Sequence, residues 1–498
     1  MLKTHLEYVI NPFFIMILYH IYAIFAVMKE QDIKKYFDLM APNRDKWKKK
    51  SCYYYNHLEN FLSFIVPENK RVLEIGCGTG DLLFKLNPSY GLGIDISEKM
   101  IELARQKNSN PKIEFKSGTI DDIEGLFDYI VLSDLIGFLP DIEEFFRKLS
   151  RITHPQSKII ITQYSQLWEP ILSFASSVGL RMPITMTQNW ISLEDINNFL
   201  RLTGFEAVKS GKKLLLPKNI PLVSKIINNY LINLWPLNKL ALVNYVVARP
   251  MAIGDKKNKP SLSVIVPARN EAGTIEKIVQ QIPELGAFTE IIFVEGHSAD
   301  NTLEEIKRVV DKYKGKRRLK YFVQSGKGKG DAVRLGFEMA EGDILAIYDS
   351  DMTVPANDLE KFYNAIADGR GEFINGSRLV YSLEDESMRN LNYLANKIFS
   401  YLFSWILDQP IKDTLCGTKV LWKKDYQDIK ANRKYFGDFD PFGDFDLLFG
   451  ATKLNLKIVE VPIRYKPREY GKTNISRFSH GWMLLKMVVF AMNKIKFK

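Results

Sequence analysis

The first half of the chain alternates short apolar runs with segments whose apolar positions recur every three or four residues. Apolar runs occupy residues 71–75, 90–95, 112–115, 127–133 and 158–163. Helical spacing of apolar positions marks residues 97–107 and 142–152. Strands that alternate with amphipathic helices predict a parallel, doubly wound sheet. Ligands bind such a sheet beyond the carboxyl ends of its strands.

The second half repeats this pattern after a polar segment, residues 249–260, which contains both proline and glycine. A segment of that composition predicts a linker. Beyond it, apolar strands are expected within residues 261–271, at 290–294 and at 343–348, with a helix from Thr274. Each of these strands runs into a polar loop. The sequence therefore predicts a second α/β domain with polar residues at its strand ends.

The length of 498 residues leaves room for roughly three domain-sized units. We expect two doubly wound, Rossmann-like α/β domains with apolar helices at the termini. The expected order is residues 1–50 as an apolar helix and basic connector, 51–248 as the first domain, 249–260 as a linker, 261–478 as the second domain and 479–498 as a basic amphipathic helix.

The net charge of +11 is concentrated in two segments. Residues 461–498 hold nine Lys or Arg against one acid, and residues 29–50 hold eight against four, so the remainder is near neutral. Such a surface suits nucleic acid, a phosphorylated substrate or anionic lipid. Both segments adjoin apolar stretches, which favours lipid.

The N-terminal apolar stretch, residues 8–28, carries no formal charge and is about as long as a bilayer span. Asn11, Pro12 and His20 interrupt it, so a helix packed on the first domain or lying at a membrane interface is an equal alternative. No small-residue cleavage site follows, which argues against a signal peptide. The basic residues after it predict that the domains act at the cytoplasmic face of a membrane, peripherally or behind one N-terminal span, and otherwise in the cytoplasm.

The C-terminal stretch, residues 481–498, combines apolar residues with Lys486, Lys494, Lys496 and Lys498. This composition suits a helix on a membrane surface, and equally a helix that caps the last domain. The chain has three cysteines without metal-ligand spacing, which fits a reducing compartment.

A glycine-rich motif, Glu74-x-Gly76-x-Gly78-x-Gly80, stands at the end of the first expected strand, and Asp95 ends the second. Glycines allow a tight turn and a close approach of ligand to backbone N–H groups. A carboxylate at the second strand end can accept hydrogen bonds from both ribose hydroxyls. The two features together predict a nucleoside-type cofactor, either a nicotinamide dinucleotide or S-adenosylmethionine.

Residues 71–80, followed by Gly93-Ile-Asp-Ile-Ser97, resemble the class I S-adenosylmethionine-dependent methyltransferases, and the resemblance runs from about residue 36 to about residue 205. It implies that the cofactor is bound by Glu74, Gly76, Gly78, Gly80, Asp95, Gly118, Thr119 and Ile120. Ser133 and Asp134 would face the methyl group, with Asp134 as a catalytic candidate; the alternative for Asp134 is a solvated loop acid.

Methyl transfer is a direct displacement by the acceptor, so the protein mainly aligns the reactants. A general base is needed only when the nucleophile is a hydroxyl. No His-Asp or His-Glu constellation marks one, and His154 is expected to be structural. The methyl acceptor stays open.

The second domain places Asp349 and Asp351 directly after an apolar strand. Two carboxylates on one side of an extended segment can hold a divalent cation, which can bridge a nucleotide diphosphate. The upstream strand and loop, Val264-Ile-Val-Pro-Ala-Arg-Asn-Glu271, strengthen the motif.

Residues 261–478 resemble the family 2 glycosyltransferases of the GT-A fold, in the branch of the dolichyl- and polyprenyl-phosphate sugar transferases. The motifs that fit are Gly328-Lys-Gly-Asp-Ala-Val-Arg334, Asn375-Gly-Ser-Arg378, Asp413-Thr-Leu-Cys-Gly-Thr-Lys419 and Glu460-Val-Pro-Ile463. The resemblance implies a UDP- or GDP-sugar bound by Pro267, Arg269, Glu271, Glu295, Asp300, Lys329, Arg334 and Asp349, with Mg²⁺ or Mn²⁺ on Asp349 and Asp351. Gly296 replaces a second acid of the family, so the base that is read stays open.

In Gly443-Asp-Phe-Asp446, Asp444 and then Asp446 are the candidates for activating the sugar acceptor. A phosphate acceptor, largely ionised already, would scarcely need a base. Arg378, Arg464, Arg468 and Lys472 could bind that phosphate.

The leading hypothesis is therefore a membrane-associated, bifunctional enzyme: an inverting, metal-dependent glycosyltransferase acting on a lipid-linked or polyprenyl-phosphate acceptor, and a methyltransferase. The alternative is a glycosyltransferase for a soluble glycan or metabolite, with the methyltransferase fold as a sensor of S-adenosylmethionine. Nucleic acid is not expected as a partner, because the first domain lacks an Asn-Pro-Pro-Tyr-type base pocket and the basic charge lies outside it.

Overall fold

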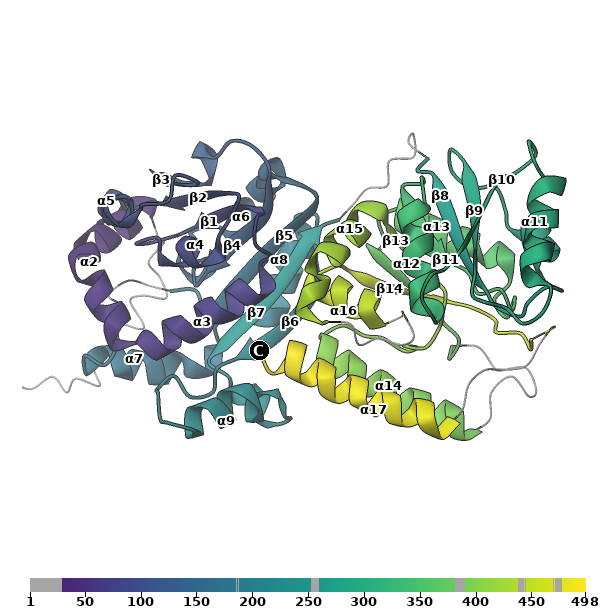
Figure 1. Cartoon of the computed structure of the whole chain (residues 1–498). Coiled ribbons are helices and arrows are strands. Elements are labelled where there is room, and N and C mark those ends of the chain that lie inside the picture. The colour runs from purple at the N-terminus through teal and green to yellow at the C-terminus, as the bar shows by residue number, and fades with distance from the viewer. Residues whose placement is uncertain are drawn as a thin grey trace, which may run out of the picture. The chain divides into compact units, whose positions relative to one another are not determined.

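The computed structural model describes residues 29–184, 186, 188–251, 259–380, 390–437, 443, 445–468, 470 and 477–498, without the side chains of 390–394 and 477–480. The chain divides into two compact units, Met1–Pro250 and Met251–Lys498 (Figure 1). The apolar stretch 8–28 and the site candidates Asp444 and Lys472 lie outside the described residues.

The first unit contains a seven-stranded sheet in the order β3-β2-β1-β4-β5-β7-β6. The strands are β1 Arg71–Ile75, β2 Tyr90–Asp95, β3 Ile113–Ser117, β4 Phe127–Ser133, β5 Thr153–Tyr164, β6 Phe205–Lys213 and β7 Val243–Pro250. Strands β1 to β5 are parallel, whereas β7 runs antiparallel to both β5 and β6. The chain first extends the sheet from β1 to β3 in one direction and then continues with β4 on the other side of β1. This change of direction leaves a crevice beyond the carboxyl ends of β1 and β4.

Helices cover both faces of this sheet, as expected for a doubly wound fold. They are α2 Glu30–Lys50, α3 Cys52–Ile65, α4 Asp81–Leu86, α5 Glu98–Lys107, α6 Ile142–Leu149, α7 Glu169–Ser177, α8 Leu193–Leu202 and α9 Val223–Asn229. Their spacing follows the sequence, since α6 buries Ile142, Phe145, Phe146 and Leu149 on one face. The predicted helix 142–152 is shorter than expected, because a 3₁₀ turn replaces its last residues.

The core of the first unit consists of two clusters, because successive strand residues point to opposite faces. Val72 of β1 packs with Leu58 and Leu62 of α3. Its neighbour Leu73 packs in the second cluster with Phe146 of α6. The sheet is therefore buried on both faces, which agrees with its continuous apolar strands.

The second unit contains a seven-stranded sheet in the order β10-β9-β8-β11-β13-β12-β14. The strands are β8 Leu262–Ala268, β9 Thr289–Glu295, β10 Arg318–Val323, β11 Ile344–Ile347, β12 Phe373–Ser377, β13 Lys419–Trp422 and β14 Ile458–Pro462. Strand β13 is antiparallel to its neighbours β11 and β12, and the other pairs are parallel. Both sheets are thus parallel-dominated and mixed, in line with two Rossmann-like domains.

The second unit contains helices between and after its strands, the first following β8 and the second following β9. They are α10 Ile275–Gln281, α11 Thr302–Lys312, α12 Lys329–Met339, α13 Leu359–Ala367, α14 Asn390–Leu407, α15 Lys423–Asn432, α16 Phe445–Lys453 and α17 Arg477–Ala491. The C-terminal helix α17 lies along α14 (Figure 1). It buries Leu484, Met487, Val488 and Ala491, spaced on one helical face, in the core of this unit.

The other face of α17 exposes Trp482, Leu485 and Val489. The C-terminal helix therefore caps the core with one side and leaves apolar side chains on the other. Among the described residues, no helix combines the length and apolarity that a bilayer span requires.

Candidate active sites

A cavity of about 480 Å³ lies beyond the carboxyl ends of β1, β2 and β4. It collects most of the residues that the sequence proposed for a cofactor, although they come from four separate segments. The lining includes Glu74, Gly76, Gly78, Asp95, Gly118, Thr119, Ile120, Ser133 and Asp134. Gly80 is not part of the lining: a side chain there would meet Phe115 Cζ at 2.5 Å, so this glycine allows close packing instead.

The glycine loop after β1 brings its backbone to the cavity. Gly76, Gly78 and Gly80 have φ angles of +76°, +53° and +81°, which other residues adopt rarely. A side chain at Gly78 would meet no described atom within 4 Å. The loop therefore leaves open space beside Gly78, where a ligand can approach the main chain.

Asp95 is fixed at the end of β2 by two backbone donors. Its Oδ2 accepts a hydrogen bond from Gly78 N at 2.8 Å, and its Oδ1 accepts one from Ser97 N at 2.9 Å. Burial raises the pKa of this carboxyl, and the two N–H groups act against that rise. Each oxygen keeps a second lone pair, so the carboxylate can still accept from a diol.

Glu74, the penultimate residue of β1, is a buried acid. Its Oε2 has no hydrogen-bond partner among the residues that the structure describes. Burial raises the pKa of Glu74 to about 8, although Lys48 acts against this. A buried carboxylate oxygen that lines a cavity fits a ligand ammonium group, such as that of a methionine moiety. Glu74, Gly78 and Asp95 thus fit S-adenosylmethionine.

Asp134 follows β4 in a left-handed conformation, with φ of +53°. Tyr54 of α3 donates its hydroxyl proton to Oδ2 of Asp134 at 2.6 Å, and Thr162 Oγ1 lies 3.5 Å from Oδ1. Burial raises the pKa of the Asp134 carboxyl, and the Tyr54 hydrogen bond opposes the rise. The side chain is held at the cavity wall rather than in a solvated loop.

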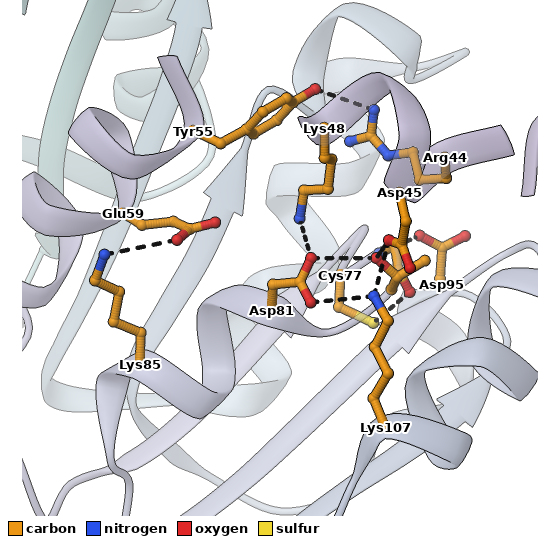
Figure 2. Close-up of polar contacts among 12 residues, drawn as sticks. Arg44, Asp45, Lys48, Tyr55, Glu59, Cys77, Asp81, Lys85, Asp95 and Lys107 are labelled. Carbon is orange, nitrogen blue, oxygen red and sulfur yellow. Dashed lines mark hydrogen bonds and ion pairs between the residues drawn. The ribbon is translucent and has the colours of Figure 1, made fainter. Parts of the chain in front are cut away.

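Ion pairs link helix α2 to Asp81, directly after the glycine loop, and to Lys107 of α5 (Figure 2). Lys48 Nζ lies 2.7 Å from Asp81 Oδ2, and Lys107 of α5 reaches Asp45 at 2.8 Å and Asp81 at 3.2 Å. Thr79 donates to Asp45 at 3.1 Å. A segment expected to be a basic connector therefore forms part of the cavity.

The cavity wall next to Asp134 combines tyrosines with arginines that the sequence did not single out. We call this set the tyrosine–arginine wall; its members are Arg44, Tyr54, Tyr55, Tyr164 and Arg181. They come from α2, α3, the end of β5 and the segment after α7. The only sequence signal is the clustering of tyrosines at residues 53–55.

In the second unit, Arg468 bridges two acids from different strand ends. Its Nη1 lies 3.0 Å from Glu271 Oε1, and its Nη2 lies 2.9 Å from Asp351 Oδ2. Burial raises the pKa of Glu271 to about 7, with Arg468 opposing the rise. Arg468, assigned from the sequence to the acceptor phosphate, thus contacts a predicted metal ligand.

Asp349 is paired with Lys329, the first residue of α12, at 2.6 Å. Burial opposes ionisation of Asp349, but the Lys329 charge and hydrogen bond hold its pKa below the usual value. A Cβ atom at Gly417 would overlap both Asp349 Oδ2 and Lys329 Nζ. The loop before β13 therefore closes over this ion pair, which the sequence did not foresee.

The segment that carries the two aspartates is a turn, not the extended segment that the spacing suggested. Ser350 and Asp351 lie in the turn, and Met352 follows with φ of +54°. Asp351 also accepts hydrogen bonds from Thr353 N at 3.2 Å and Thr353 Oγ1 at 2.9 Å. Because of this geometry, the two carboxylates pair with different cationic side chains.

The other nucleotide candidates lie at or just after the ends of β8 and β9 and on α12. Glu295 ends β9 and accepts from Ser298 N at 2.6 Å, while Asp300 accepts from Thr302 N at 3.0 Å. The Pro267 carbonyl accepts from Ser350 Oγ at 2.9 Å. Arg269 is exposed directly after β8, and Arg334 is half-buried on α12.

Two of the acceptor candidates, Arg378 and Asp446, each form an ion pair. Arg378 forms a bidentate pair with Asp413 at 2.7 and 2.9 Å, and Arg464 is exposed. Asp446 pairs with Arg433 at 2.8 Å. Within the part of the chain that the structure describes, no cluster of three His, Cys, Asp or Glu side chains is arranged to hold a metal.

Comparison with known families agrees with this division. Residues 67–195 match the family model described as a methyltransferase domain, and residues 263–430 match glycosyl transferase family 2. The chain is a fusion of a methyltransferase with a family 2 glycosyltransferase. Both units thus match families of transferases.

Relatives of the glycosyltransferase unit include glycosyltransferase AglJ of Haloferax volcanii, 28% identical over 45% of this chain and 69% of that protein. Dolichol-phosphate mannosyltransferase of Pyrococcus furiosus is 29% identical, over 43% of this chain and 59% of its own length. The methyltransferase unit is similar to ribosomal protein L11 methyltransferase of Thermotoga neapolitana, with 34% identity over 20% of this chain and 40% of that protein.

Among solved structures, the magnesium protoporphyrin IX methyltransferase of Synechocystis with bound S-adenosylhomocysteine aligns with a TM-score of 0.32 and 15% identity. That alignment covers 45% of this chain and all of the other.

Proposed function

We propose that the glycosyltransferase unit transfers a sugar from a UDP- or GDP-sugar to a polyprenyl-phosphate or other lipid-linked acceptor, with inversion and with Mg²⁺ or Mn²⁺. The methyltransferase unit transfers a methyl group to a component of the same pathway. The observation that carries the proposal is the cluster of acids at the ends of β8 and β11, which already holds two cationic side chains, Lys329 and Arg468.

This cluster fits a divalent cation. A guanidinium group that bridges Glu271 and Asp351 occupies a place where positive charge is favoured, and Glu271 Oε2 has no hydrogen-bond partner among the described residues. Asp349 and Asp351 would hold the ion, with oxygen ligands of the kind that Mg²⁺ and Mn²⁺ prefer. A divalent ion there supplies positive charge that neutralises the diphosphate as the sugar leaves.

Lys329 and Arg334 would bind the phosphates. Lys329 opens helix α12, whose first N–H groups and partial positive charge favour an anion. With Asp349 as a metal ligand, the Lys329 ammonium would be available to a phosphate oxygen. The same exchange at Asp351 would free Arg468 for the acceptor phosphate.

The acceptor class rests on the relatives, one of which is a dolichol-phosphate mannosyltransferase. Arg464 and Lys472 stay candidates for the acceptor phosphate. Arg378 is less suited, because its Nε and Nη2 atoms are engaged in a bidentate pair with the buried Asp413. Asp444 stays a candidate base, and Asp446 would first have to leave Arg433.

Action at a membrane surface is supported by exposed apolar side chains in each unit. In the first unit, Phe174 of α7 is 63% exposed, and Leu222 and Trp235 near α9 are 79% and 76% exposed. Residues 214–242 hold three lysines and no acid. Apolar and aromatic side chains with lysines suit the headgroup region of an anionic bilayer. We expect sedimentation with phosphatidylglycerol vesicles and weaker binding by a Leu222→Ser/Trp235→Ser variant.

In the methyltransferase unit, Glu74 would pair with the ammonium group of S-adenosylmethionine and Asp95 would accept from its ribose hydroxyls. Gly78 would allow the close approach of the ligand to the main chain, and Ile120 would pack on the base. The cofactor supplies an activated methyl group. The protein contributes alignment, and Asp134 contributes a carboxylate that can accept a proton.

Calorimetric titration tests the two sites separately. Wild-type protein should bind one nucleotide sugar in the presence of Mn²⁺, and Asp351→Ala should lose this binding but keep that of S-adenosylmethionine. Asp95→Ala should do the reverse. Loss of both ligands in either folded variant, or donor binding that ignores Mn²⁺ and Asp351, would refute the assignment.

A further inference from the structure

Two arginines of the tyrosine–arginine wall have no carboxylate partner in the described part of the chain. Arg44 Nη1 contacts the Tyr55 hydroxyl at 3.1 Å and Met182 Sδ at 3.9 Å. Arg181 lies over the Tyr164 ring, with Cζ 4.7 Å from the ring centre. Both side chains are half-buried and line the cavity. Partly desolvated guanidinium groups usually pair with a carboxylate or a phosphate.

Aromatic contacts hold the wall together next to Asp134. Tyr54 stacks on Tyr164 with ring centres 5.6 Å apart and meets Tyr55 edge-on at 5.1 Å. Tyr54 also donates its hydroxyl proton to Asp134 at 2.6 Å. The arginines and the carboxylate at the end of β4 therefore belong to one connected group of side chains.

This group contains none of the residues that fit the cofactor's ribose and methionine moiety. Asp95 accepts hydrogen bonds from Gly78 N and Ser97 N and acts on Arg44 electrostatically, and Lys48 pairs with Asp81. Arg44 and Arg181 thus remain as cations near Asp134, and both act electrostatically on that carboxyl. The sulfonium centre of the methyl donor would add a third positive charge near Asp134. An anionic acceptor would balance these charges.

We propose that the methyl acceptor is an anionic molecule whose phosphate or carboxylate group is bound by Arg44 and Arg181. This inference rests on the proposed methyltransferase function of the same cavity. The guanidinium groups bind the oxyanion, and the tyrosine rings restrict their orientation. An acceptor without a negative charge would leave both cations unpaired and is selected against.

The transfer balances without a further reactant. The acceptor oxygen forms a bond to the methyl carbon while the carbon–sulfur bond breaks, and the electron pair of that bond stays on sulfur. Where the nucleophile is a hydroxyl beside the bound anion, its proton goes to the Asp134 carboxylate. Where the nucleophile is an oxygen of the anion itself, no proton is released.

Arginine footprinting on the full chain tests the location of the anion. The protein, saturated with S-adenosylhomocysteine, is treated with phenylglyoxal in the presence and absence of inorganic phosphate or acetate, and modified peptides are quantified by mass spectrometry. We expect phosphate, acetate or both to slow modification of Arg44 and Arg181 at least fivefold. The exposed Arg201, which is outside the cavity lining, serves as the internal control. Which of the two anions protects distinguishes a phosphate from a carboxylate acceptor.

Calorimetry of matched variants completes the test. Arg181→Ala and Arg44→Ala should bind the protecting anion at least tenfold more weakly than wild type, the lysine variants should recover part of the loss, and Arg201→Ala should match wild type. All should bind S-adenosylhomocysteine within about threefold of wild type, which shows an intact cavity. Equal modification rates with and without anion, in protein that binds S-adenosylhomocysteine, would overturn the inference. Failure of the wild type to bind S-adenosylhomocysteine would instead overturn the proposed function.

Discussion

Replacement of Glu74 by Gln tests whether this buried acid is kept for a cationic ligand. Burial raises the pKa of Glu74 from 4.5 to about 8. The folded state therefore binds the proton more tightly than the unfolded state does, so stability is highest below pH 4.5 and falls as the pH rises to about 8. Gln has the same shape and does not titrate, so Glu74→Gln should escape this loss.

The magnitude follows from the size of the shift. One pKa unit corresponds to about 1.4 kcal/mol, so the full shift corresponds to about 5 kcal/mol above pH 8 and to about 3 kcal/mol at pH 7. For a unit of this size, 1 kcal/mol moves the melting temperature by about 2–4 °C. In the absence of ligand, Glu74→Gln should therefore melt about 6–12 °C higher than wild type at pH 7, and the two should converge near pH 4.

Bound S-adenosylmethionine should narrow this difference. Its ammonium group would pair with the Glu74 carboxylate, and the amide of Gln lacks the charge to replace it. A hydrogen bond to a charged group contributes about 1.5–3 kcal/mol, so the variant should bind the cofactor about 10- to 100-fold more weakly.

Differential scanning calorimetry between pH 4 and 9 provides the measurement, with the transition of the first unit identified as the one that S-adenosylmethionine shifts. Glu98→Gln, an exposed acid at the start of α5, is the matched control and should leave the transition in place. A difference between Glu74→Gln and wild type that does not vary with pH, or a variant less stable at pH 8, would refute the reasoning.

Three further predictions follow from single contacts. Gly417→Ala should disrupt the Lys329–Asp349 pair, because a Cβ atom would overlap both side chains. In titrations, this variant should lose Mn²⁺-dependent donor binding and keep S-adenosylmethionine binding. Asp413→Asn should destabilise the second unit by about 3–5 kcal/mol in urea unfolding, because it leaves the charge of the Arg378 guanidinium uncompensated. An unchanged free energy of unfolding would mean that the pair is dispensable. Tyr54→Phe should remove the hydroxyl that lowers the pKa of Asp134, so the acidic limb of a methyl-transfer pH profile should move to higher pH. An unmoved limb would exclude Asp134 as the proton acceptor.

The strands that were best predicted are those whose signal is local. The expected bounds of β1, β2 and β4 agree with the structure, because each is a mainly apolar run that is followed by a polar or glycine residue. Strand β5 is longer than expected, since its first residues are polar. Neither β7 nor β13 was identified as antiparallel, because strand direction depends on the chain path between strands and not on composition.

The sequence by itself determined that the candidate residues lie at strand ends. Parallel strands end at one edge of a sheet, so Glu74, Asp95 and Asp134 had to converge once β1, β2 and β4 were adjacent. The same rule placed Asp349 and Asp351 near Glu271. These predictions needed only the period of the apolar residues and the position of polar residues after them.

Only the tertiary structure decided which charges meet. Arg468 reaches Glu271 across 197 positions of sequence, and Arg44 joins a wall with Arg181 from a separate segment. No local pattern marks such pairs, because the energy that brings them together comes from apolar packing elsewhere in the fold. The partners of a buried charge, and hence the ligand that it favours, are therefore read from the folded chain.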